Sequence, residues 1–402
     1  ARKPRRVLVL GAGTGNDVAA ALRAGAERVD AVEIDPRIID LGRELHGERP
    51  YQDPRVRLIV DDARAFLKRE GEAYDLIVFG LLDAHTSFYS SLTGGIRLDN
   101  YVYTVESFRH ALARLEKPGG MLALSFYVEQ PWIATRMAAM MEQAAGEKPL
   151  VAQIASNTFT FIAGPAAPAA GGPLTRGLDP GFVAAYPPGP LSTDDWPFIY
   201  LQGRRVPPMI VSAGFAILLI TAIVILAFFR NETGFVRHYF FLGAGFLLLE
   251  TRTIAQLALL YGTTWRVSAI AIAAILGVIL VANLIVLRRP SMPRAWLYPA
   301  LFVALVANYL VPPASALGGG AGAVAGVTAL LALPVLFAAF IFSTSIARES
   351  ALAPVLASNL TGAVLGGLLE NASLLFGIAA LNLLAAALYA LSIRRSRGVT
   401  SA

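Results

Sequence analysis

Residues 6–17 read Arg-Val-Leu-Val-Leu-Gly-Ala-Gly-Thr-Gly-Asn-Asp, an apolar run that ends in a glycine-rich turn. The apolar run predicts a buried strand, and the alanine-rich residues 16–24 behind it predict a helix. Glycines between the two allow a tight turn and a close approach of the backbone to a ligand. This stretch therefore predicts the first strand–loop–helix unit of a ligand-binding α/β sheet.

Strand-like and helix-like pieces continue to alternate through residue 130. Alternation at this spacing predicts a doubly wound, Rossmann-like parallel sheet, whose ligands sit at the carboxyl ends of the strands. The expected strands are 6–11, 29–35, 56–60, 74–79 and 121–126, and the expected helices are 16–24, 36–45, 63–70 and 105–115.

Acidic residues follow the second and third expected strands. Glu33 stands 18 residues after Gly15, and Asp62 closes the third strand. The dinucleotide pattern GxGxxG is broken after Gly15, so an adenosyl sulfonium ligand fits better than a nicotinamide. The alternative is that Glu33 and Asp62 only cap the helices at Pro36 and Ala63. The candidate cofactor residues are Gly11, Ala12, Gly13, Thr14, Gly15, Glu33, Ile34, Asp62 and Ala63.

Four stretches within residues 6–130 resemble the spermidine synthase (aminopropyltransferase) branch of class I S-adenosylmethionine-type folds. They read VLVLGAGTG, VDAVEIDPRIIDLGREL, DPRVRLIVDDARAFLKREGEAYDLIVFGLLD and YTVESFRHALARLEKPGGML. The resemblance implies that Glu33 binds ribose, that Asp62 with Ala63 contacts adenine, and that the Gly11–Gly15 loop lies under the methionine-derived tail. It also implies S-adenosylmethionine or its decarboxylated form as cofactor, and an amine or polyamine as acceptor.

Two positions depart from the pattern of that family. Thr14 stands where the first loop usually has Asp, and Gly80 stands where an Asp after the fourth strand acts as base. Asp83, the second acid of that segment, remains, and His85 beside it titrates near neutrality. We expect Asp83 and His85 to be the catalytic candidates, and the alternative is an exposed turn with capping groups.

Residues 206–402 are of a different kind, with seven long apolar segments. Each is near the roughly 20 residues that span a bilayer as a helix. The second segment carries Glu250 and Arg252. These residues form either a polar site or gate inside the membrane, or a structural pair that ties helices together. The segments are 207–229, 237–260, 265–287, 294–312, 321–347, 351–370 and 373–392.

Two stretches resemble bacterial membrane proteins with a spermidine synthase-like domain, namely residues 241–265 in the apolar half and residues 192–198 at the junction before it. The expected organisation is a nucleoside-binding domain at 1–163, a linker and junction at 164–205, and six or seven transmembrane segments at 206–395. We expect an integral protein of the bacterial inner membrane with its soluble domain in the cytosol. Seven crossings would instead place most of the Arg residues on the far side, against the positive-inside rule.

Composition and charge exclude further classes of protein. The mean hydropathy is +0.57 and the formal charge +6, and residues 206–402 hold 11 Arg against 4 Glu. The positive charge thus lies between apolar runs, which speaks against a nucleic-acid partner. Without Cys, and with four scattered His, no metal site is expected. The start at Ala1, without Met, indicates a fragment or processed chain.

These observations favour a membrane-anchored transferase that moves an aminopropyl or methyl group from the sulfonium cofactor to an amine or a membrane-proximal acceptor. The lipid bilayer is its expected partner. The alternative is a nucleoside-binding domain that has lost catalysis and regulates a membrane transporter or sensor. A nicotinamide-dependent reductase is a weaker possibility.

Overall fold

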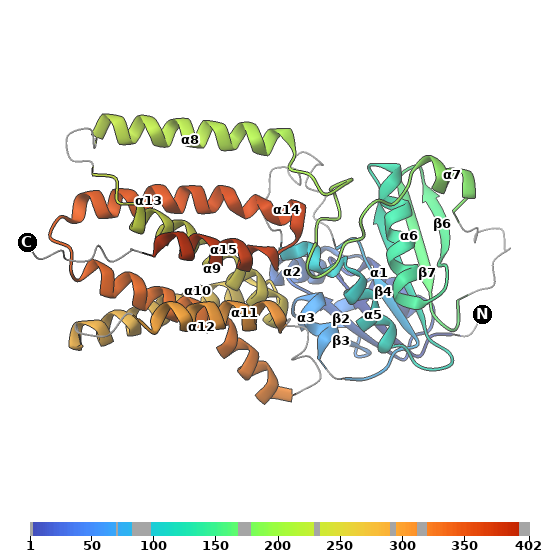
Figure 1. Cartoon of the computed structure of the whole chain (residues 1–402). Helices are drawn as coiled ribbons and strands as arrows, with labels where there is room; N and C mark the ends of the chain where they lie inside the picture. Colours follow the sequence, from blue (N-terminus) through green and yellow to red (C-terminus); the bar gives the residue numbers. More distant parts are fainter. Residues whose placement is uncertain are drawn as a thin grey trace, which may run out of the picture. The chain divides into compact units, whose positions relative to one another are not determined.

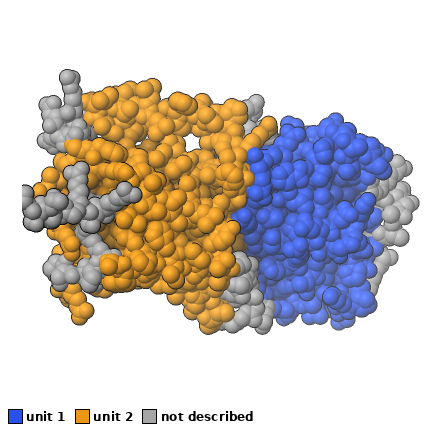
Figure 2. Space-filling view, in the orientation of Figure 1, with its two compact units in different colours: residues 1–204, 261–265 blue, residues 205–260, 266–402 orange. Residues whose placement is uncertain are grey.

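The computed structural model describes residues 3–69, 71–82, 98–167, 178–228, 234–289, 295–311 and 320–393. The chain divides into two compact units, which Figure 2 shows in different colours. Unit 1 comprises residues 1–204 together with 261–265, and unit 2 comprises residues 205–260 and 266–402.

Unit 1 is built on a seven-stranded sheet of order β3-β2-β1-β4-β5-β7-β6 (Figure 1). The first five strands pair in parallel, which confirms the expected doubly wound α/β fold. The sheet is mixed rather than parallel throughout, because β6 and β7 join as an antiparallel hairpin beside β5. Their short connection leaves no room for the crossover helix that a parallel pair needs. The strands are β1 (Arg6–Leu10), β2 (Arg28–Glu33), β3 (Val56–Val60), β4 (Leu76–Phe79), β5 (Met121–Tyr127), β6 (Leu150–Ala155) and β7 (Thr158–Ala163).

Alternate residues of the central strand β1 face two separate cores. Val7 and Val9 pack in a cluster with residues of α1 (Asn16–Arg23) and α2 (Pro36–Leu45). Leu8 and Leu10 pack on the opposite face with residues of α3 (Ala63–Lys68), α5 (Val105–Ala113) and α6 (Pro131–Ala145). The period-two alternation of a strand thus produces a sheet covered by helices on both faces.

The segment before the second unit is packed into unit 1. Trp196 is fully buried and meets the ring of Phe198 edge-on, so its ring packs inside unit 1. Arg136 on α6 donates to the carbonyl oxygens of Ile199 and Leu201 at 2.9 and 2.6 Å. Asp194 accepts from Arg64 at 2.8 Å. These contacts tie the junction to the sheet domain.

The partly buried His110 belongs to the same contact. The Arg64 guanidinium lies 2.6 Å from His110 Nδ1, and Thr104 Oγ1 donates to Asp194 at 2.9 Å. Burial and the Arg64 charge lower the pKa of His110 to about 4, so the imidazole is neutral and its Nδ1 accepts a hydrogen bond from the Arg64 guanidinium. Two short elements complete the unit: η2 (Leu98–Val102) and α7 (Pro180–Ala185).

Unit 2 is helical. Among the described residues, five helices are long and apolar enough to cross a membrane, within 208–227, 237–261, 269–288, 322–346 and 352–376. The apolar helices 297–310 and 380–392 are shorter. The elements are α8 (Pro208–Phe228), α9 (Arg237–Tyr261), α10 (Trp265–Arg288), α11 (Leu297–Leu310), α12 (Gly320–Ile346), α13 (Leu352–Leu369), η4 (Glu370–Ala372), α14 (Ser373–Phe376) and α15 (Ala380–Ser392).

Helix α9 lies at the centre of this unit and meets α13 through glycines. A Cβ on Gly362 would clash with the carbonyl oxygen of Phe240, and one on Gly366 would lie 2.5 Å from that of Ala244. Gly362 and Gly366 are four residues apart, so they form a small-xxx-small stripe that lets two backbones approach. The apolar stretch of α9 is 61% buried and that of α8 is 0% buried, so α9 is a core element of unit 2.

Candidate functional site

The glycine loop joins β1 to α1 and adopts a conformation that only glycine accepts readily. Gly11, Gly13 and Gly15 have φ values of 69°, 57° and 105°. A Cβ on Gly11 would clash with Leu82, whereas a Cβ on Gly13 would meet nothing closer than 4.0 Å. Gly13 therefore borders open space, where a ligand can approach the backbone, while Gly11 makes the close turn.

Glu33 ends β2 and holds the glycine loop. Its side chain is only 6% exposed. Oε2 accepts from the Gly13 N–H at 2.8 Å, and Oε1 accepts from the N–H groups of Ile34 and Asp35 at 2.8 and 3.0 Å. The alternative role as a cap of α2 is wrong for Glu33, because Asp35 accepts from the Arg37 N–H at 2.8 Å and caps that helix.

Asp62 follows β3 and caps α3, as the alternative role expected. Oδ1 accepts from the Ala65 N–H at 2.7 Å. Oδ2 accepts from the Thr263 hydroxyl at 2.7 Å and from the Thr263 N–H at 3.3 Å. Thr263 lies in the loop 261–265, which clusters with unit 1. Both carboxylate oxygens of Asp62 thus already have protein donors.

Exposed apolar side chains stand beside these acids. Ile34 follows β2, Val60 ends β3 and Leu81 follows β4, and all three are among the exposed large hydrophobics of the chain. Because parallel strands end at the same edge of the sheet, this edge combines carboxylates with apolar surface. Such a combination suits a ligand with a flat apolar base and a hydroxylated sugar.

At the end of β4, the carboxylate of Asp17 from α1 lies beside Gly80, the position at which the sequence resemblance predicts a catalytic base. A Cβ on Gly80 would lie 3.0 Å from Asp17 Oδ2 and 2.8 Å from the Gly11 carbonyl oxygen. Burial raises the pKa of Asp17 above its ordinary value. Asp17 belongs to the first turn of α1, so a carboxylate from α1 occupies space that a side chain on β4 would need. Asp83 and His85 lie outside the described residues.

The two charged residues of α9 have separate surroundings. Arg252 is 3% exposed and donates to the carbonyl oxygen of Asn308 on α11 at 2.9 Å. Glu250 lines a cavity within unit 2 that Arg252 does not line. The two side chains stand two positions apart on the helix and therefore point to different faces.

Sequence reasoning missed three residues of the site. Tyr51 donates to the Gly13 carbonyl oxygen at 2.6 Å, and burial, with Glu33 and Asp17 nearby, raises its pKa, which keeps the hydroxyl protonated. The sequence pointed to Asp17 only indirectly, because Asn16 and Asp17 follow Gly15 where the GxGxxG pattern breaks. Thr263 stands 201 residues from Asp62, so no local signal pointed to their contact.

Comparison with known proteins finds similarity over the first 158 residues of unit 1. Residues 1–158 match the family model of the spermine/spermidine synthase domain. Polyamine aminopropyltransferase 1 and 2 of Pseudomonas aeruginosa are 30% and 29% identical over 29% and 30% of this chain, and 38% and 33% of their own lengths. A spermidine synthase solved with the transition-state analogue AdoDATO is 14% identical, with a TM-score of 0.30, over 52% of this chain and 68% of that one.

The chain thus spans between a third and two fifths of the length of these two curated relatives. The matched residues include the glycine loop, Glu33 and Asp62. Residues 1–158 accordingly carry a domain similar to the spermine/spermidine synthase domain, and they include strands β1 to β6 of the seven-stranded Rossmann-like sheet.

Proposed function

We propose that unit 1 binds S-adenosylmethionine or its decarboxylated form and transfers a methyl or aminopropyl group to an amine. The observation that carries this proposal is Glu33, a buried carboxylate at the carboxyl end of β2, fixed by three backbone N–H groups beside the glycine loop. The likeness of residues 1–158 to the spermine/spermidine synthase domain supports the same ligand class.

The residues present fit an adenosyl ligand. A carboxylate offers about four acceptor positions, and three of those on Glu33 are filled, so one is left for a ribose hydroxyl. The open space at Gly13 and the exposed side chains of Ile34 and Val60 provide room and apolar surface for the rest of the nucleoside. Asp62 becomes available to an adenine amino group when Thr263 releases it.

When bound, the sulfonium donor supplies an electrophilic carbon next to sulfur. The protein's task is to hold the amine in line with that carbon and to take its proton. Each turnover forms one C–N bond, breaks one C–S bond and releases one proton. Asp17 is the described carboxylate closest to the family's base position at Gly80, and Asp83 is the second candidate.

We also propose that the chain is an integral protein of the bacterial inner membrane, with unit 1 on the cytosolic side. The five long apolar helices of the described residues support insertion in a bilayer. The cytosolic side is chosen because the sulfonium cofactor is a cytosolic metabolite. An acceptor that is itself membrane-proximal would fit this arrangement.

A second candidate function is regulation of a membrane transporter or sensor by a nucleoside-binding domain without turnover. Gly80 in place of the family's base favours this regulatory function. So does the hydrogen bond that the Thr263 hydroxyl donates to Asp62. In this case, nucleoside binding would alter the loop between α9 and α10 and no alkyl group would move.

Mass spectrometry of the nucleoside products separates these functions. The full chain in lipid nanodiscs is incubated with either sulfonium donor and a mixture of cellular amines. Methylthioadenosine from the decarboxylated donor, or S-adenosylhomocysteine from S-adenosylmethionine, together with an equal amount of alkylated amine, supports the transferase. Bound but unconverted donor supports the regulatory function, and absence of binding contradicts both.

A further inference from the structure

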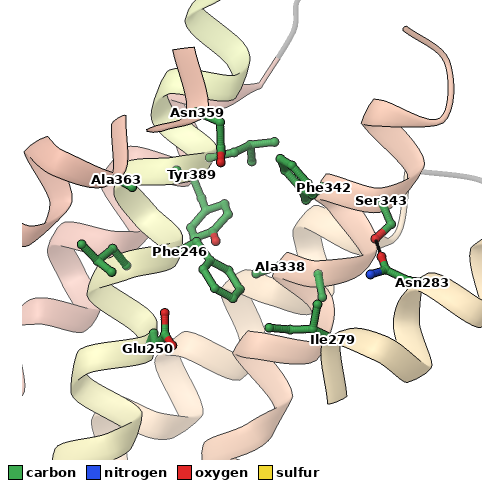
Figure 3. A pocket seen from close by; sticks show the side chains of 14 residues that line it. Phe246, Glu250, Ile279, Asn283, Ala338, Phe342, Ser343, Asn359, Ala363 and Tyr389 are labelled. Atoms are coloured by element: carbon green, nitrogen blue, oxygen red, sulfur yellow. Dashed lines mark hydrogen bonds between the residues drawn. The ribbon is translucent and has the colours of Figure 1, made fainter. Parts of the chain in front are cut away.

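Unit 2 contains a partly open cavity, and none of the candidate nucleoside-binding residues lines it. Helices α9, α10, α12, α13 and α15 line it, and its volume is about 300 Å³ (Figure 3). This volume is at the lower end for small-molecule pockets, so a ligand of modest size fits. Figure 3 shows Phe246 and Glu250 of α9 beside the cavity, with Phe342 of α12 on another wall.

The cavity contains one carboxylate, from Glu250. Glu250 is the fourteenth residue of the 25-residue helix α9, so it lies about 20 Å along the helix axis from the first residue. Within the part of the chain that the structure describes, Glu250 has no hydrogen-bond or ion-pair partner. A carboxylate in apolar surroundings is costly unless a cation or hydrogen-bond donors accompany it.

The nearest basic residue in the sequence does not serve as that cation. Leu242, Phe246 and Glu250 recur every four residues and face the cavity together. Arg252 lies two positions further and donates to the Asn308 carbonyl oxygen, away from this face. The charge of Glu250 therefore remains directed at the cavity.

The other walls favour an organic cation over a metal ion. Phe246, Phe342 and Tyr389 place three aromatic side chains around the cavity, and aromatic faces attract ammonium groups. Apolar residues such as Ile279 and Ala338 would pack on a short hydrocarbon body. Hard divalent cations prefer several oxygen ligands, and no group of three His, Cys, Asp or Glu suited to a metal occurs in the described ranges.

We propose that this cavity is a binding site for a small organic ammonium ion, with Glu250 as its counter-ion and the rings of Phe246, Phe342 and Tyr389 as its walls. Asn359 and the hydrogen-bonded pair Ser343 and Asn283 add polar groups to the lining. The site is separate from the nucleoside edge of unit 1, so the proposal does not depend on the proposed transfer reaction.

Binding of radiolabelled phenethylammonium to the full chain in nanodiscs tests this site. We expect saturable binding that is at least tenfold weaker in Glu250→Gln, since this change removes only the charge. Glu370→Gln is the matched control, because Glu370 lies in η4 and does not line the cavity, and it should bind as the wild type does. Glu33→Gln should also bind normally, whatever its effect on the nucleoside.

Two further measurements keep the result clear. Ala363→Leu fills part of the cavity without changing charge and should weaken binding of the ammonium ion. This variant tests the proposed site even if Glu250→Gln does not fold. The uncharged 2-phenylethanol should compete poorly for the site. Equal binding by wild type and Glu250→Gln, no effect of Ala363→Leu, or competition by the alcohol as strong as by unlabelled amine would each overturn the proposal.

Discussion

Asp17 is a carboxylate that the described part of the fold leaves without a hydrogen-bond or ion-pair partner. It is the second residue of α1 and lies beside Gly80, the position at which the sequence resemblance predicts a catalytic acid. Since burial raises its pKa, Asp17 takes up a proton at a higher pH than an exposed aspartate does. This property suits a group that removes a proton from an amine and then releases it to water.

For Asp17→Asn we expect turnover to fall by about 10²–10⁴-fold, the usual contribution of a positioned base. In the wild type the rate should fall as pH decreases through the raised pKa of Asp17, because the protonated acid accepts nothing. This acid limb should disappear in the variant. The pH dependence of kcat, measured with product mass spectrometry, checks both expectations.

Asp40→Asn is the control, since Asp40 is an exposed acid of α2 that forms an ion pair with Arg43. Removing the partly buried charge of Asp17, which has no hydrogen-bond or ion-pair partner among the described residues, should not lower the melting temperature, so loss of activity would not reflect unfolding. A wild-type rate and pH profile in Asp17→Asn would assign the base to another residue, with Asp83 next in line.

The strand-end acids could be predicted from the sequence because a strand, a glycine turn and a helix are local patterns. Glu33 ends one apolar strand and Asp62 lies two residues after the end of another, so the sheet topology determines the edge at which both lie. The role of Tyr51 could not be predicted, since its hydroxyl reaches Gly13 across 38 residues. The same holds for Asp17, whose relation to Gly80 depends on two neighbouring strands.

At the scale of elements, the loop 261–265 occupies one oxygen of Asp62. Thr263 donates its hydroxyl and its backbone N–H to Oδ2. An adenine amino group that binds Asp62 must replace this contact or share it. The loop joins α9 to α10, so its release is a change at the ends of two helices.

Thr263→Val removes the hydroxyl donor at nearly constant size, and we expect the nucleoside to bind a few-fold more tightly. A hydrogen bond from a neutral donor to a carboxylate contributes about 1.5–3 kcal/mol. The backbone N–H of residue 263 still competes with the nucleoside for Asp62, so the gain should be smaller. Equilibrium dialysis with S-adenosylhomocysteine measures the change, with Thr264→Val as a neighbouring control. Weaker binding in Thr263→Val would show that the threonine supports the nucleoside site instead of competing with it.

The contact of α9 with α13 depends on glycine at two positions. We expect Gly362→Ala to lower the melting temperature of the full chain strongly, because its Cβ would clash with the carbonyl oxygen of Phe240. Gly277→Ala in α10 is the matched control, since a Cβ there meets nothing within 4 Å. Alanine favours helices, so the control should be neutral or slightly stabilising. Similar melting temperatures for the two variants would contradict this packing.

The elements that sequence reasoning missed have non-local causes. The hairpin of β6 and β7 lies behind α6 in the chain, and only its pairing with β5 shows that it extends the sheet. Residues 192–201 belong to the expected linker and junction at 164–205, yet tertiary contacts bury Trp196 within unit 1. The apolar helices of unit 2 were easier to predict, because length and hydropathy alone reveal them.

At the scale of the whole molecule, two expectations about orientation disagree. The cofactor places unit 1 in the cytosol, whereas a count of Arg over seven crossings places most positive charge on the opposite side. The chain has no Cys, so a single introduced thiol reports its own position. Gly47 is a suitable site, because it is exposed and a Cβ there meets nothing within 4 Å.

For Gly47→Cys we expect a membrane-impermeant maleimide to label inverted inner-membrane vesicles and not intact spheroplasts. Labelling after detergent lysis gives the total. The reverse pattern would place unit 1 outside, as the seven-crossing count requires, and would remove the cytosolic cofactor from its reach.

The central claim is that Glu33 holds an adenosyl nucleoside at the carboxyl edge of the sheet. Equilibrium dialysis of S-adenosylhomocysteine and methylthioadenosine against the full chain in nanodiscs tests it most directly. We predict saturable binding by the wild type and by Glu27→Gln, an exposed acid paired with Arg5. Glu33→Gln should bind about 10–100-fold more weakly, as loss of a charge-assisted hydrogen bond implies. Unchanged affinity in Glu33→Gln, or no binding by the wild type, would contradict the account.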